Sequence, residues 1–364
     1  MVLVCPLDWG IGHATRCVPV IRELAASGAS VIIAADGRPY DFLKSQFPAL
    51  PLIRFPGFRI IYPNGKNMAL RMLLQSPGIL YGIWKEHRKL KELTAEYQID
   101  LVISDNRFGL WSKKVKSVYI THQLMIKAAP GLKWIEPLLY RIHQWFINRY
   151  DACWVPDVPG KLNLSGDLSH RYPLPSHGSY IGTLSRFAGV SPSNLSRTNK
   201  PPNKLLVLIS GPEPQRTIFE KLILKELEKL NPGTTVVLQG LPGKEGRTSP
   251  FPGVTIFPHL PDQDIRDLII GSEIIICRPG YSTVMDLVRL GRTAVLVPTP
   301  GQTEQEYLAR HLSGSGLFTC MAQDSFKLVE AISAMKKIPA TDNITTFNII
   351  NTFGQNFKQL IDFT

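Results

Sequence analysis

The sequence has few cysteines and no long apolar run. Its five cysteines include no CxxC pair, so the sequence indicates neither a disulfide framework nor a cysteine zinc site. No stretch of about 18 uncharged apolar residues occurs, which argues against a membrane-spanning helix; the nearest candidate, 68–84, contains Arg71 and a Ser-Pro-Gly break. The opening MVLVCPLDWG has no basic residues ahead of its apolar run and is typical of a first strand, not of a signal peptide. These absences predict a cytoplasmic protein.

Acidic residues are scarce in the first half of the chain. The 364 residues are 44% hydrophobic and 19% charged, which predicts a globular chain of two domains. Residues 1–150 contain 20 Lys and Arg against 10 Asp and Glu, whereas residues 151–364 contain 21 against 19. Most of the net charge of +12 therefore lies in the first half. Such a charge attracts anionic partners, namely phosphorylated acceptors, anionic lipid or nucleic acid, although solubility alone would also explain it.

Short β-branched runs alternate with amphipathic stretches such as 15–27 and 84–97, which is typical of parallel sheets wrapped by helices. The predicted strands are 2–6, 30–35, 100–105, 117–122 and 151–156 in a first series and 204–210, 234–240, 254–258, 273–277 and 293–298 in a second. We therefore predict two Rossmann-like, doubly wound parallel-sheet domains that face each other across a cleft. The predicted parts are a first domain at 1–182, a linker at 183–203, a second domain at 204–342 and a terminal helix at 343–364 that packs back toward the first domain.

A glycine turn follows the first predicted strand. Gly10 and Gly12 would let the backbone turn tightly and approach a ligand, and the helix start behind them offers N–H groups to anionic oxygens. Read as a dinucleotide fingerprint, the turn lacks its third glycine, although Asp36 stands where a ribose-binding acid would. His13 comes directly after the turn. Since an imidazole ordinarily titrates near neutral pH, His13 is a candidate general base, with a capping or supporting role as the alternative.

Polar residues also end the next strands of the first half. Asp105 closes one strand and His122 follows another, so both are expected at the same sheet edge as His13, where either could assist the base. Capping and turn formation are the alternative for both. Arg16 shares the helix face of His13 and is expected to pair with a carboxylate or a phosphate.

Three strand ends of the second half carry candidate ligand-binding groups. A Ser-Gly turn at Ser210 opens a helix and is typical of a diphosphate site. A second tight turn, which carries the hydroxyls of Ser282 and Thr283 at a helix start, follows Arg278. Amide and carboxylate side chains cluster after the last strand, where they could bind sugar hydroxyls. The Asp-Gln-Asp run at 262–264 is expected to cap a helix rather than to hold a metal ion. These candidates are Ser210, Gly211, Gln215, Arg278, Gly280, Ser282, Thr283, Gln302, Glu304, Gln305 and Glu306.

The motifs GIGHATR and CRPGYSTVMDLVRLGRTAVLVPTPGQTEQEYLA resemble those of GT-B glycosyltransferases of the MurG type, most specifically over 8–17 and 256–310. The resemblance implies an inverting enzyme that uses a nucleotide-sugar donor, a UDP-sugar above all, and that requires no metal or other cofactor. The run GIGHATRC also resembles the GxGHxxR loop of nucleotide-sugar hydrolases, which cleave the activated sugar with water.

The resemblance also implies roles for individual residues. His13 would lie near the acceptor and the donor sugar, and the loop Ser210–Gln215, SGPEPQ here, would lie near the diphosphate. The remaining implied contacts are Leu260 with the nucleobase, Gly280, Ser282 and Thr283 with the phosphates, Asp286 with the ribose hydroxyls, and Gln305 and Glu306 with the donor sugar.

The predicted function is transfer of a hexose or an N-acetylhexosamine to a hydroxyl acceptor with inversion. Hydrolysis of the nucleotide-sugar is the alternative, followed by NAD binding or nucleic-acid binding; the aromatic residues form no nucleic-acid recognition motif, so no nucleic-acid partner is expected. Residues 68–91 and 127–149 combine apolar and aromatic residues with Lys and Arg. They could lie on the inner face of an anionic membrane, as suits a lipid-linked acceptor, or could be ordinary amphipathic helices.

Overall fold

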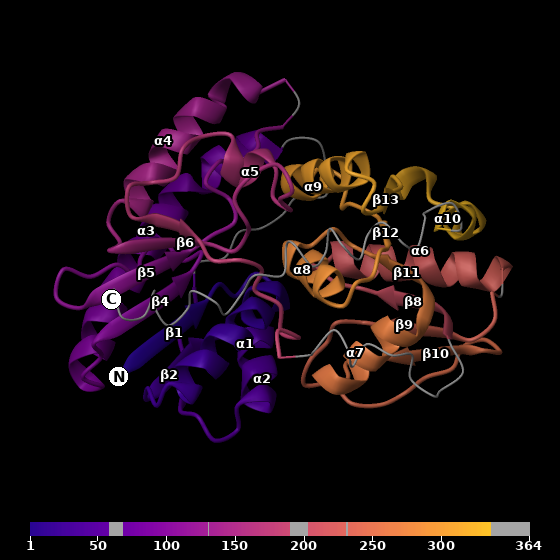
Figure 1. Ribbon diagram of the computed structural model, residues 1–364, viewed down its shortest axis with the longest axis horizontal. Helices are drawn as coiled ribbons and strands as arrows, with labels where there is room; N and C mark the ends of the chain where they lie inside the picture. Colours follow the sequence, from indigo (N-terminus) through magenta and orange to yellow (C-terminus); the bar gives the residue numbers. More distant parts are fainter. Residues whose placement is uncertain (58–67, 130, 190–202, 231, 336–364) are drawn as a thin grey trace. The chain divides into compact units, whose positions relative to one another are not determined.

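The computed structural model describes residues 1–57, 68–129, 131–189, 203–230 and 232–335. The chain divides into two compact units, of which the first ends at Leu184 and the second begins at Ser185. Each unit is an α/β domain built on one parallel sheet, with seven strands in the first and six in the second (Figure 1). The predicted fold class of two parallel-sheet domains is therefore confirmed. The facing of the domains across a cleft stays a prediction.

The first sheet has the strand order β3-β2-β1-β4-β5-β6-β7. Every residue of β1, β2 and β4 is buried, because helices cover both faces of a parallel sheet and its central strands are therefore apolar throughout. The register pairs Pro6 with Asp105, which brings the ends of β1 and β4 to one edge. The strands are β1 (Val2–Pro6), β2 (Val31–Ala35), β3 (Leu52–Arg54), β4 (Leu101–Asp105), β5 (Lys116–Ile120), β6 (Ala152–Val155) and β7 (Gly178–Tyr180).

Helices pack on the first sheet according to the spacing of their apolar residues. The first helix, α1, buries Cys17, Ile21 and Leu24 along one face. Leu90 and Leu93 of α3 pack in the cluster that contains alternate residues of β1 and β2. The helices of this unit are α1 (Ile11–Ala26), α2 (Gly37–Gln46), α3 (Met68–Glu96), η1 (Lys133–Ile135), α4 (Glu136–Ile147) and α5 (Asp167–His170).

Helix α3 is longer than the sequence pattern predicts. It begins at Met68 and not near residue 84, and it continues through Pro77. The Ser-Pro-Gly segment therefore does not interrupt the helix. Pro77 removes one backbone donor from a helix of 29 residues, and helical turns continue on both sides of it. In the described parts of the chain, no helix is both long and apolar enough to cross a membrane.

The second sheet has the order β10-β9-β8-β11-β12-β13, and its core joins β8 to α6 through Val207, Phe219 and Ile223. Its strands are β8 (Asn203–Leu208), β9 (Thr235–Leu238), β10 (Val254–Phe257), β11 (Ser272–Cys277), β12 (Val295–Leu296) and β13 (Thr319–Cys320). Its helices are α6 (Gln215–Lys229), α7 (Asp262–Gly271), α8 (Tyr281–Arg289), α9 (Thr303–Gly314), η3 (Gln323–Ser325) and α10 (Leu328–Met335).

The first residues of the predicted linker are anchored on α8. The hydroxyl of Ser185 donates to Asp286 over 2.7 Å, and Arg289 donates to the carbonyl of Ala188 over 2.6 Å. These contacts place residues 185–188 with the second unit. Residues 190–202 of the predicted linker and the predicted terminal helix 343–364 lie outside the described residues.

Candidate functional site

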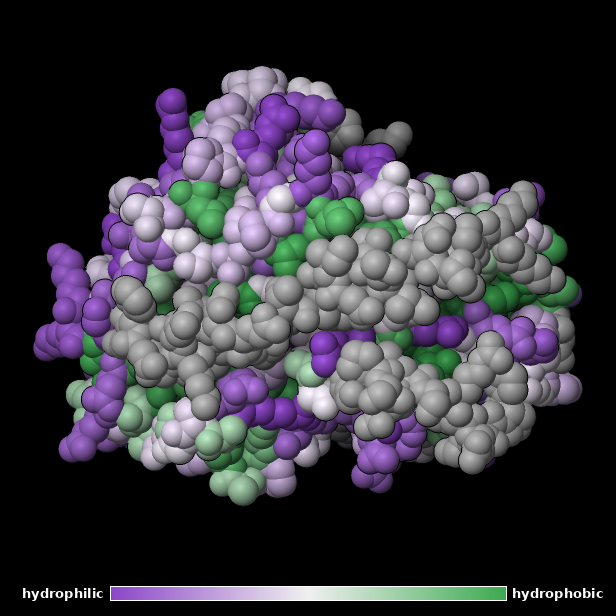
Figure 2. Space-filling model, in the orientation of Figure 1, coloured by the Kyte–Doolittle hydropathy of each residue, from purple (hydrophilic) through white to green (hydrophobic). Residues whose placement is uncertain are grey.

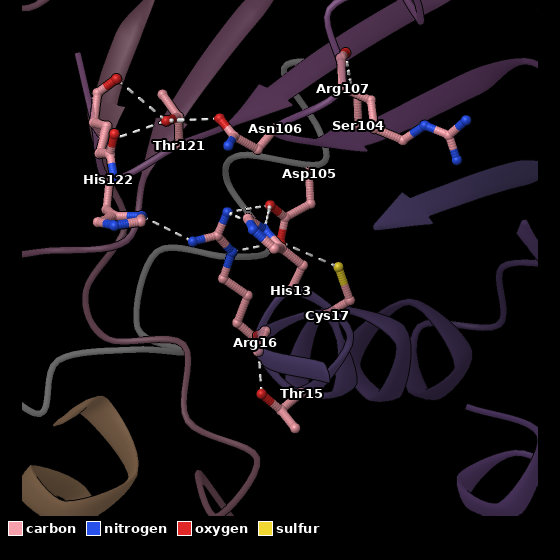
Figure 3. Close-up of polar contacts among 12 residues, drawn as sticks. His13, Thr15, Arg16, Cys17, Ser104, Asp105, Asn106, Arg107, Thr121 and His122 are labelled. Carbon is pink, nitrogen blue, oxygen red and sulfur yellow. Dashed lines mark hydrogen bonds and ion pairs between the residues drawn. The ribbon is translucent and has the colours of Figure 1, made fainter. Parts of the chain in front are cut away.

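Three of the predicted site residues meet at the carboxyl edge of the first sheet. Helix α1 follows β1 after the short loop 7–10, and its first turn places His13 beside the end of β4 (Figure 3). Nδ1 of His13 lies 3.0 Å from Oδ1 of Asp105. His122 follows β5, the strand that pairs with β4, and is 5% exposed. The parallel topology thus brings together residues that are about 90 to 110 positions apart in sequence.

Arg16 joins these three residues. It is 1% exposed, and its Nε and Nη2 donate to the two carboxylate oxygens of Asp105. Its Nη1 lies 2.9 Å from Nδ1 of His122, and its Nη2 lies 2.9 Å from Nδ1 of His13 (Figure 3). The carboxylate that Arg16 was expected to bind is therefore Asp105, and the guanidinium lies between two imidazoles.

Charges around Asp105 keep its carboxyl ionised. Burial by itself raises the pKa of Asp105, but the positive charge of Arg16, together with His13 and the hydrogen bonds from both, lowers that pKa to about 2. The thiol of Cys17 donates to Oδ2 of Asp105 over 3.5 Å. Burial, first, and the negative charge of Asp105 raise the pKa of Cys17, so this thiol stays protonated and is a poor nucleophile.

The second nitrogen of His13 is available to a ligand. Nε2 makes no hydrogen bond to the described residues, and 20% of the side chain is exposed. A β-carbon on Gly10, the residue before α1, would meet no atom within 4 Å. The backbone of Gly10 is extended, with φ 165°, a conformation that any residue adopts, so the bend of the chain at residues 8–10 does not require a glycine at this position.

In the second unit, two helix N-termini lie at one sheet edge. Strands β8 and β11 pair in register, with Cys277 opposite Leu208, so the loop before α6 and the loop before α8 are neighbours. Gly280 is the N-cap of α8, and Nη2 of Arg278 donates to the carbonyl of Gln215 over 3.4 Å. Ser210 and Gly211 lie in the first of these loops, and Ser282 and Thr283 lie in the first turn of α8.

Arg278 carries a buried positive charge that no carboxylate among the described residues pairs with. It donates to the carbonyl of Val297 and to Oε1 of Gln323 over 2.9 and 2.6 Å, and its guanidinium lies 4.0 Å from the ring centroid of Phe219. Burial lowers the pKa of Arg278 to about 9. Its Nε and the Oε1 of Gln215 are buried without hydrogen-bond partners. The orphaned Nε–H donor, on a side chain whose positive charge has no carboxylate partner among the described residues, makes this edge a candidate anion site.

Arg216, the other arginine near this edge, is already neutralised. Its Nε donates to Glu213 over 2.5 Å, and its Nη1 donates to Glu220 over 3.0 Å. The sequence alone does not distinguish Arg216 from Arg278 as a source of positive charge. The structure favours Arg278.

The carboxylate of Asp286 accepts hydrogen bonds from residues of the predicted linker. Its Oδ1 accepts the Ser185 hydroxyl and the backbone N–H of Arg186, and its Oδ2 accepts Nε of Arg186 over 2.9 Å. Nη1 of Arg186 also donates to Asp262 over 2.9 Å. The carboxylate is therefore held by Ser185 and Arg186, and its contact with ribose hydroxyls stays a prediction.

Gln305 and Glu306, two of the residues predicted to bind the donor sugar, accept hydrogen bonds from the backbone of the loop before α9. Oε1 of Gln305 accepts the backbone N–H of Thr299 over 2.9 Å, and Oε1 of Glu306 accepts that of Gly301 over 2.8 Å. The amide nitrogen of Gln305 makes no hydrogen bond to the described residues. Gln302 is the N-cap of α9, Glu304 lies in its first turn, and Leu260 is half-buried between β10 and α7.

Comparisons with known proteins agree with this arrangement. Residues 7–126 match the glycosyl transferase family 1 model, and residues 223–360 match the glycosyltransferase family 28 C-terminal domain. An uncharacterized glycosyltransferase of Methanosarcina acetivorans is 26% identical over 84% of this chain and 80% of that protein. A second relative, from Pasteurella multocida, is 22% identical over 89% of this chain and 85% of the relative's length. Its name is UDP-N-acetylglucosamine--N-acetylmuramyl-(pentapeptide) pyrophosphoryl-undecaprenol N-acetylglucosamine transferase.

The chain is a GT-B glycosyltransferase. The fold agrees with the crystal structure of the kitacinnamycin glycotransferase, with a TM-score of 0.66 and 14% identity over 99% of this chain and 98% of the other. The resemblance to GT-B glycosyltransferases, inferred from the glycine turn and the C-terminal motif, is confirmed. Asp36, whose position suggested a ribose-binding acid and hence NAD binding, forms an ion pair with Arg54 in this glycosyltransferase.

The sequence analysis did not identify one buried ion pair of the glycosyltransferase, between Arg107 and Glu86. Nη2 of Arg107 lies 3.0 Å from Oε1 of Glu86 in α3, and burial raises the pKa of Glu86 although the charge of Arg107 lowers it. Glu86 follows buried Ile83 by three residues and precedes buried Leu90 by four, so it occupies the apolar face of α3. An acid at such a position is the signal that could have found it. Within the described ranges, no group of three or more His, Cys, Asp or Glu could hold a metal ion.

Proposed function

We propose that this glycosyltransferase moves a hexose or an N-acetylhexosamine from a UDP-sugar to a hydroxyl acceptor with inversion, and that His13 is the base. The observation that carries the proposal is the pairing of His13 with Asp105. When Nδ1 of His13 holds its proton toward the carboxylate 3.0 Å away, the lone pair of the neutral ring is on Nε2, the nitrogen without a partner.

The reaction is a single displacement at the anomeric carbon. Nε2 of His13 takes the acceptor hydroxyl proton while the acceptor oxygen bonds to the anomeric carbon. The bond from that carbon to the diphosphate oxygen breaks, and its electron pair leaves with the diphosphate. Attack from the face opposite the leaving group inverts the configuration. Asp105, ionised because its pKa is about 2, stabilises the imidazolium that forms.

The diphosphate would bind at the second sheet edge. Backbone N–H groups in the first turns of α6 and α8 carry partial positive charge, and loop residues Ser210 and Gly211 precede α6. Arg278 adds a full charge, and its buried Nε lacks a partner. These groups would stabilise the leaving diphosphate without a divalent metal. Support for uridine as the nucleoside comes from the Pasteurella multocida relative, whose name gives UDP-N-acetylglucosamine as its donor.

Calorimetric titration with UDP in EDTA tests the donor site. We expect micromolar binding by the wild-type protein and none of comparable strength for GDP, dTDP or NAD. Arg278→Gln should weaken UDP binding about tenfold or more, because a hydrogen bond to a charged group contributes about 1.5–3 kcal/mol. Arg216→Gln is the matched control, since Arg216 is paired with two glutamates. Binding of NAD alone, or of UDP only when Mg²⁺ is added, would contradict the proposal.

Hydrolysis of the nucleotide-sugar is the second candidate, because the run GIGHATRC also resembles the loop of nucleotide-sugar hydrolases. The same base would then activate water in place of an acceptor hydroxyl. Release of free sugar without any acceptor, at the rate seen with acceptor present, would favour hydrolysis. Sugar release that depends on an acceptor favours transfer.

We also propose that the first unit docks on an anionic membrane, as a lipid-linked acceptor would require. Helices α3 and α4 pack together through Ile83 and Phe146, and large apolar side chains beside this contact are exposed, Trp134 by 77%. Cations lie among them: Arg88 and Arg149 each lie over one of the tryptophans. Figure 2 shows strongly hydrophilic residues intermingled with hydrophobic ones over α4. This docking face consists of Leu80, Tyr81, Trp84, Trp134, Leu138, Ile142 and Trp145.

Liposome sedimentation tests the docking face. We expect binding to phosphatidylglycerol vesicles at low salt, weaker binding at high salt and little to phosphatidylcholine vesicles. The double variant Trp84→Ala with Trp145→Ala should bind about tenfold less, because aromatic side chains anchor proteins at the membrane interface. Ile218→Ala with Val329→Ala, two exposed apolar residues of the second unit, is the control. No binding of the wild-type protein to anionic vesicles at low salt would remove this proposal.

A further inference from the structure

We propose that Glu213 is a specificity-determining residue of the donor site, whose carboxylate repels the product nucleoside diphosphate more strongly than the nucleotide-sugar and so favours product release. The inference rests on the proposed binding of the diphosphate at the second sheet edge. It comes from the hydrogen bonds that hold the Glu213 carboxylate, in the loop between β8 and α6, at the first turn of α6.

The start of α6 is already occupied by this carboxylate. Oε2 of Glu213 accepts the backbone N–H of Thr217 over 3.2 Å and the hydroxyl of the same residue over 2.8 Å. The N–H groups of Arg216 and Ile218 donate to loop carbonyls over 3.0 Å each. Among residues 215–218, only the N–H group of Gln215 bonds to no described residue. The helix start therefore offers few donors to a diphosphate and holds a negative charge of its own.

The charge of Glu213 is only partly neutralised. Nε of Arg216 donates to Oε1 of Glu213 over 2.5 Å, but Nη1 of the same guanidinium donates to Glu220 over 3.0 Å. One positive charge thus faces two carboxylates, which leaves one negative charge on the three side chains together. Burial raises the pKa of Glu213, but the hydrogen bonds from Arg216 and Thr217 lower it overall, so the carboxylate is ionised at neutral pH.

The negative charge of this group is presented at the loop. The Glu213 side chain is 50% exposed, whereas those of Arg216 and Glu220 are 7% and 11% exposed. Glu213 precedes Gln215 by two residues, and the carbonyl of Gln215 accepts Nη2 of Arg278 over 3.4 Å. A diphosphate held by Arg278 would therefore lie at the loop that carries the Glu213 carboxylate.

The repulsion differs between donor and product because transfer changes the charge of the diphosphate. In the nucleotide-sugar each phosphate carries one negative charge, since the terminal phosphate is esterified by the sugar. When the bond from the anomeric carbon to the diphosphate oxygen breaks, its electron pair stays on that oxygen. The terminal phosphate of the product then carries nearly one further charge at neutral pH. A fixed carboxylate repels in proportion to the charge of the ligand, so it destabilises the bound product more than the bound donor.

Calorimetric titration of Glu213→Gln at low salt tests this role with two probes, UDP and its β-methyl ester. The ester lacks the further charge of the product, as a nucleotide-sugar does, and requires no knowledge of the sugar. At a separation of about 8 Å in water, each ligand charge changes the affinity by a factor of about two. We therefore expect UDP to bind about eightfold more tightly to the variant and the ester about fourfold, with smaller gains at high salt.

Glu228→Gln is the matched control, because it removes an exposed glutamate near the other end of the same helix. It should leave both affinities within about twofold. Glu213→Asp keeps the charge and should keep the wild-type ratio of the two affinities, and Glu213→Ala should repeat the gains of the glutamine variant.

Unchanged or weaker UDP binding in the folded Glu213→Gln and Glu213→Ala variants would overturn the proposal, and so would an equal gain for both probes. Failure of the donor site is a separate result. It would appear as no UDP binding by the wild-type protein or by any of the variants, and it would remove this inference with it.

Discussion

Replacement of His13 by alanine reduces kcat by about 10²–10⁴-fold and leaves the affinity for UDP almost unchanged. A positioned general base contributes a factor of this size, and no other described group at the first sheet edge combines an unpartnered basic nitrogen with exposure. The nucleotide contacts proposed here lie in the second unit, so they do not depend on the imidazole. Steady-state turnover with a UDP-sugar and calorimetry with UDP measure the two effects.

A matched histidine variant separates this loss from a general effect on folding. His311 lies in the last turn of α9 and stacks on Tyr307, far in sequence from the residues around His13. His311→Ala should retain turnover within about twofold, because this half-buried imidazole lies in the last turn of α9, away from the donor-sugar residues at the start of that helix. A loss of less than about fivefold in His13→Ala would exclude His13 as the base.

Removal of the Asp105 carboxylate lowers the free energy of unfolding by about 3–5 kcal/mol at pH 7. Asp105→Ala leaves the guanidinium of Arg16 buried without its anion, and removal of one partner of a buried ion pair typically costs this much. Urea unfolding followed by circular dichroism measures the change. Asp41→Ala removes an exposed carboxylate and should change stability by less than about 0.5 kcal/mol. A cost for Asp105→Ala no larger than that of the control would contradict the ion-pair account.

The same pairing makes the stability difference depend on pH. The folded-state pKa of Asp105 is about 2, below the ordinary value of 3.8, so its contribution is complete above about pH 3.8 and is lost as the pH falls through about 2. A shift of this size corresponds to about 2 kcal/mol. The wild-type protein and Asp105→Asn should therefore differ in stability near neutral pH and converge toward pH 2. A difference that stays constant down to pH 2 would show that the carboxylate is not stabilised by its charge.

The strands that the sequence pattern missed are short and contain no fully buried residue. Strands β3, β7 and β13 have two or three residues each and none of their residues is fully buried, so they show neither a continuous apolar run nor alternation. The central strands, such as β1 and β4, are buried along their whole length and are visible as apolar runs. Burial on both faces is therefore the property that makes a strand of a parallel sheet readable from sequence.

The candidate site was predictable where residues directly follow a strand. His13, Asp105 and His122 were expected at one sheet edge because the carboxyl ends of parallel strands meet there, and their contacts with one another or with Arg16 bear this out. Pairings between distant residues were not predictable. Asp286 binds Arg186 across 100 positions, and nothing near Asp286 in sequence indicates that its carboxylate is occupied.

The sequence by itself determined the two-domain α/β organisation, the glycosyltransferase family and the strand ends where chemistry is placed, because periodicity and strand-end motifs are local properties of the chain. Only the tertiary structure decided which charges are paired. Arg216 is neutralised by two glutamates while Arg278 has no carboxylate partner among the described residues, and Arg16 is shared by Asp105 and two imidazoles. The net charge of a site depends on distances between side chains that folding brings together, and sequence spacing does not carry that information.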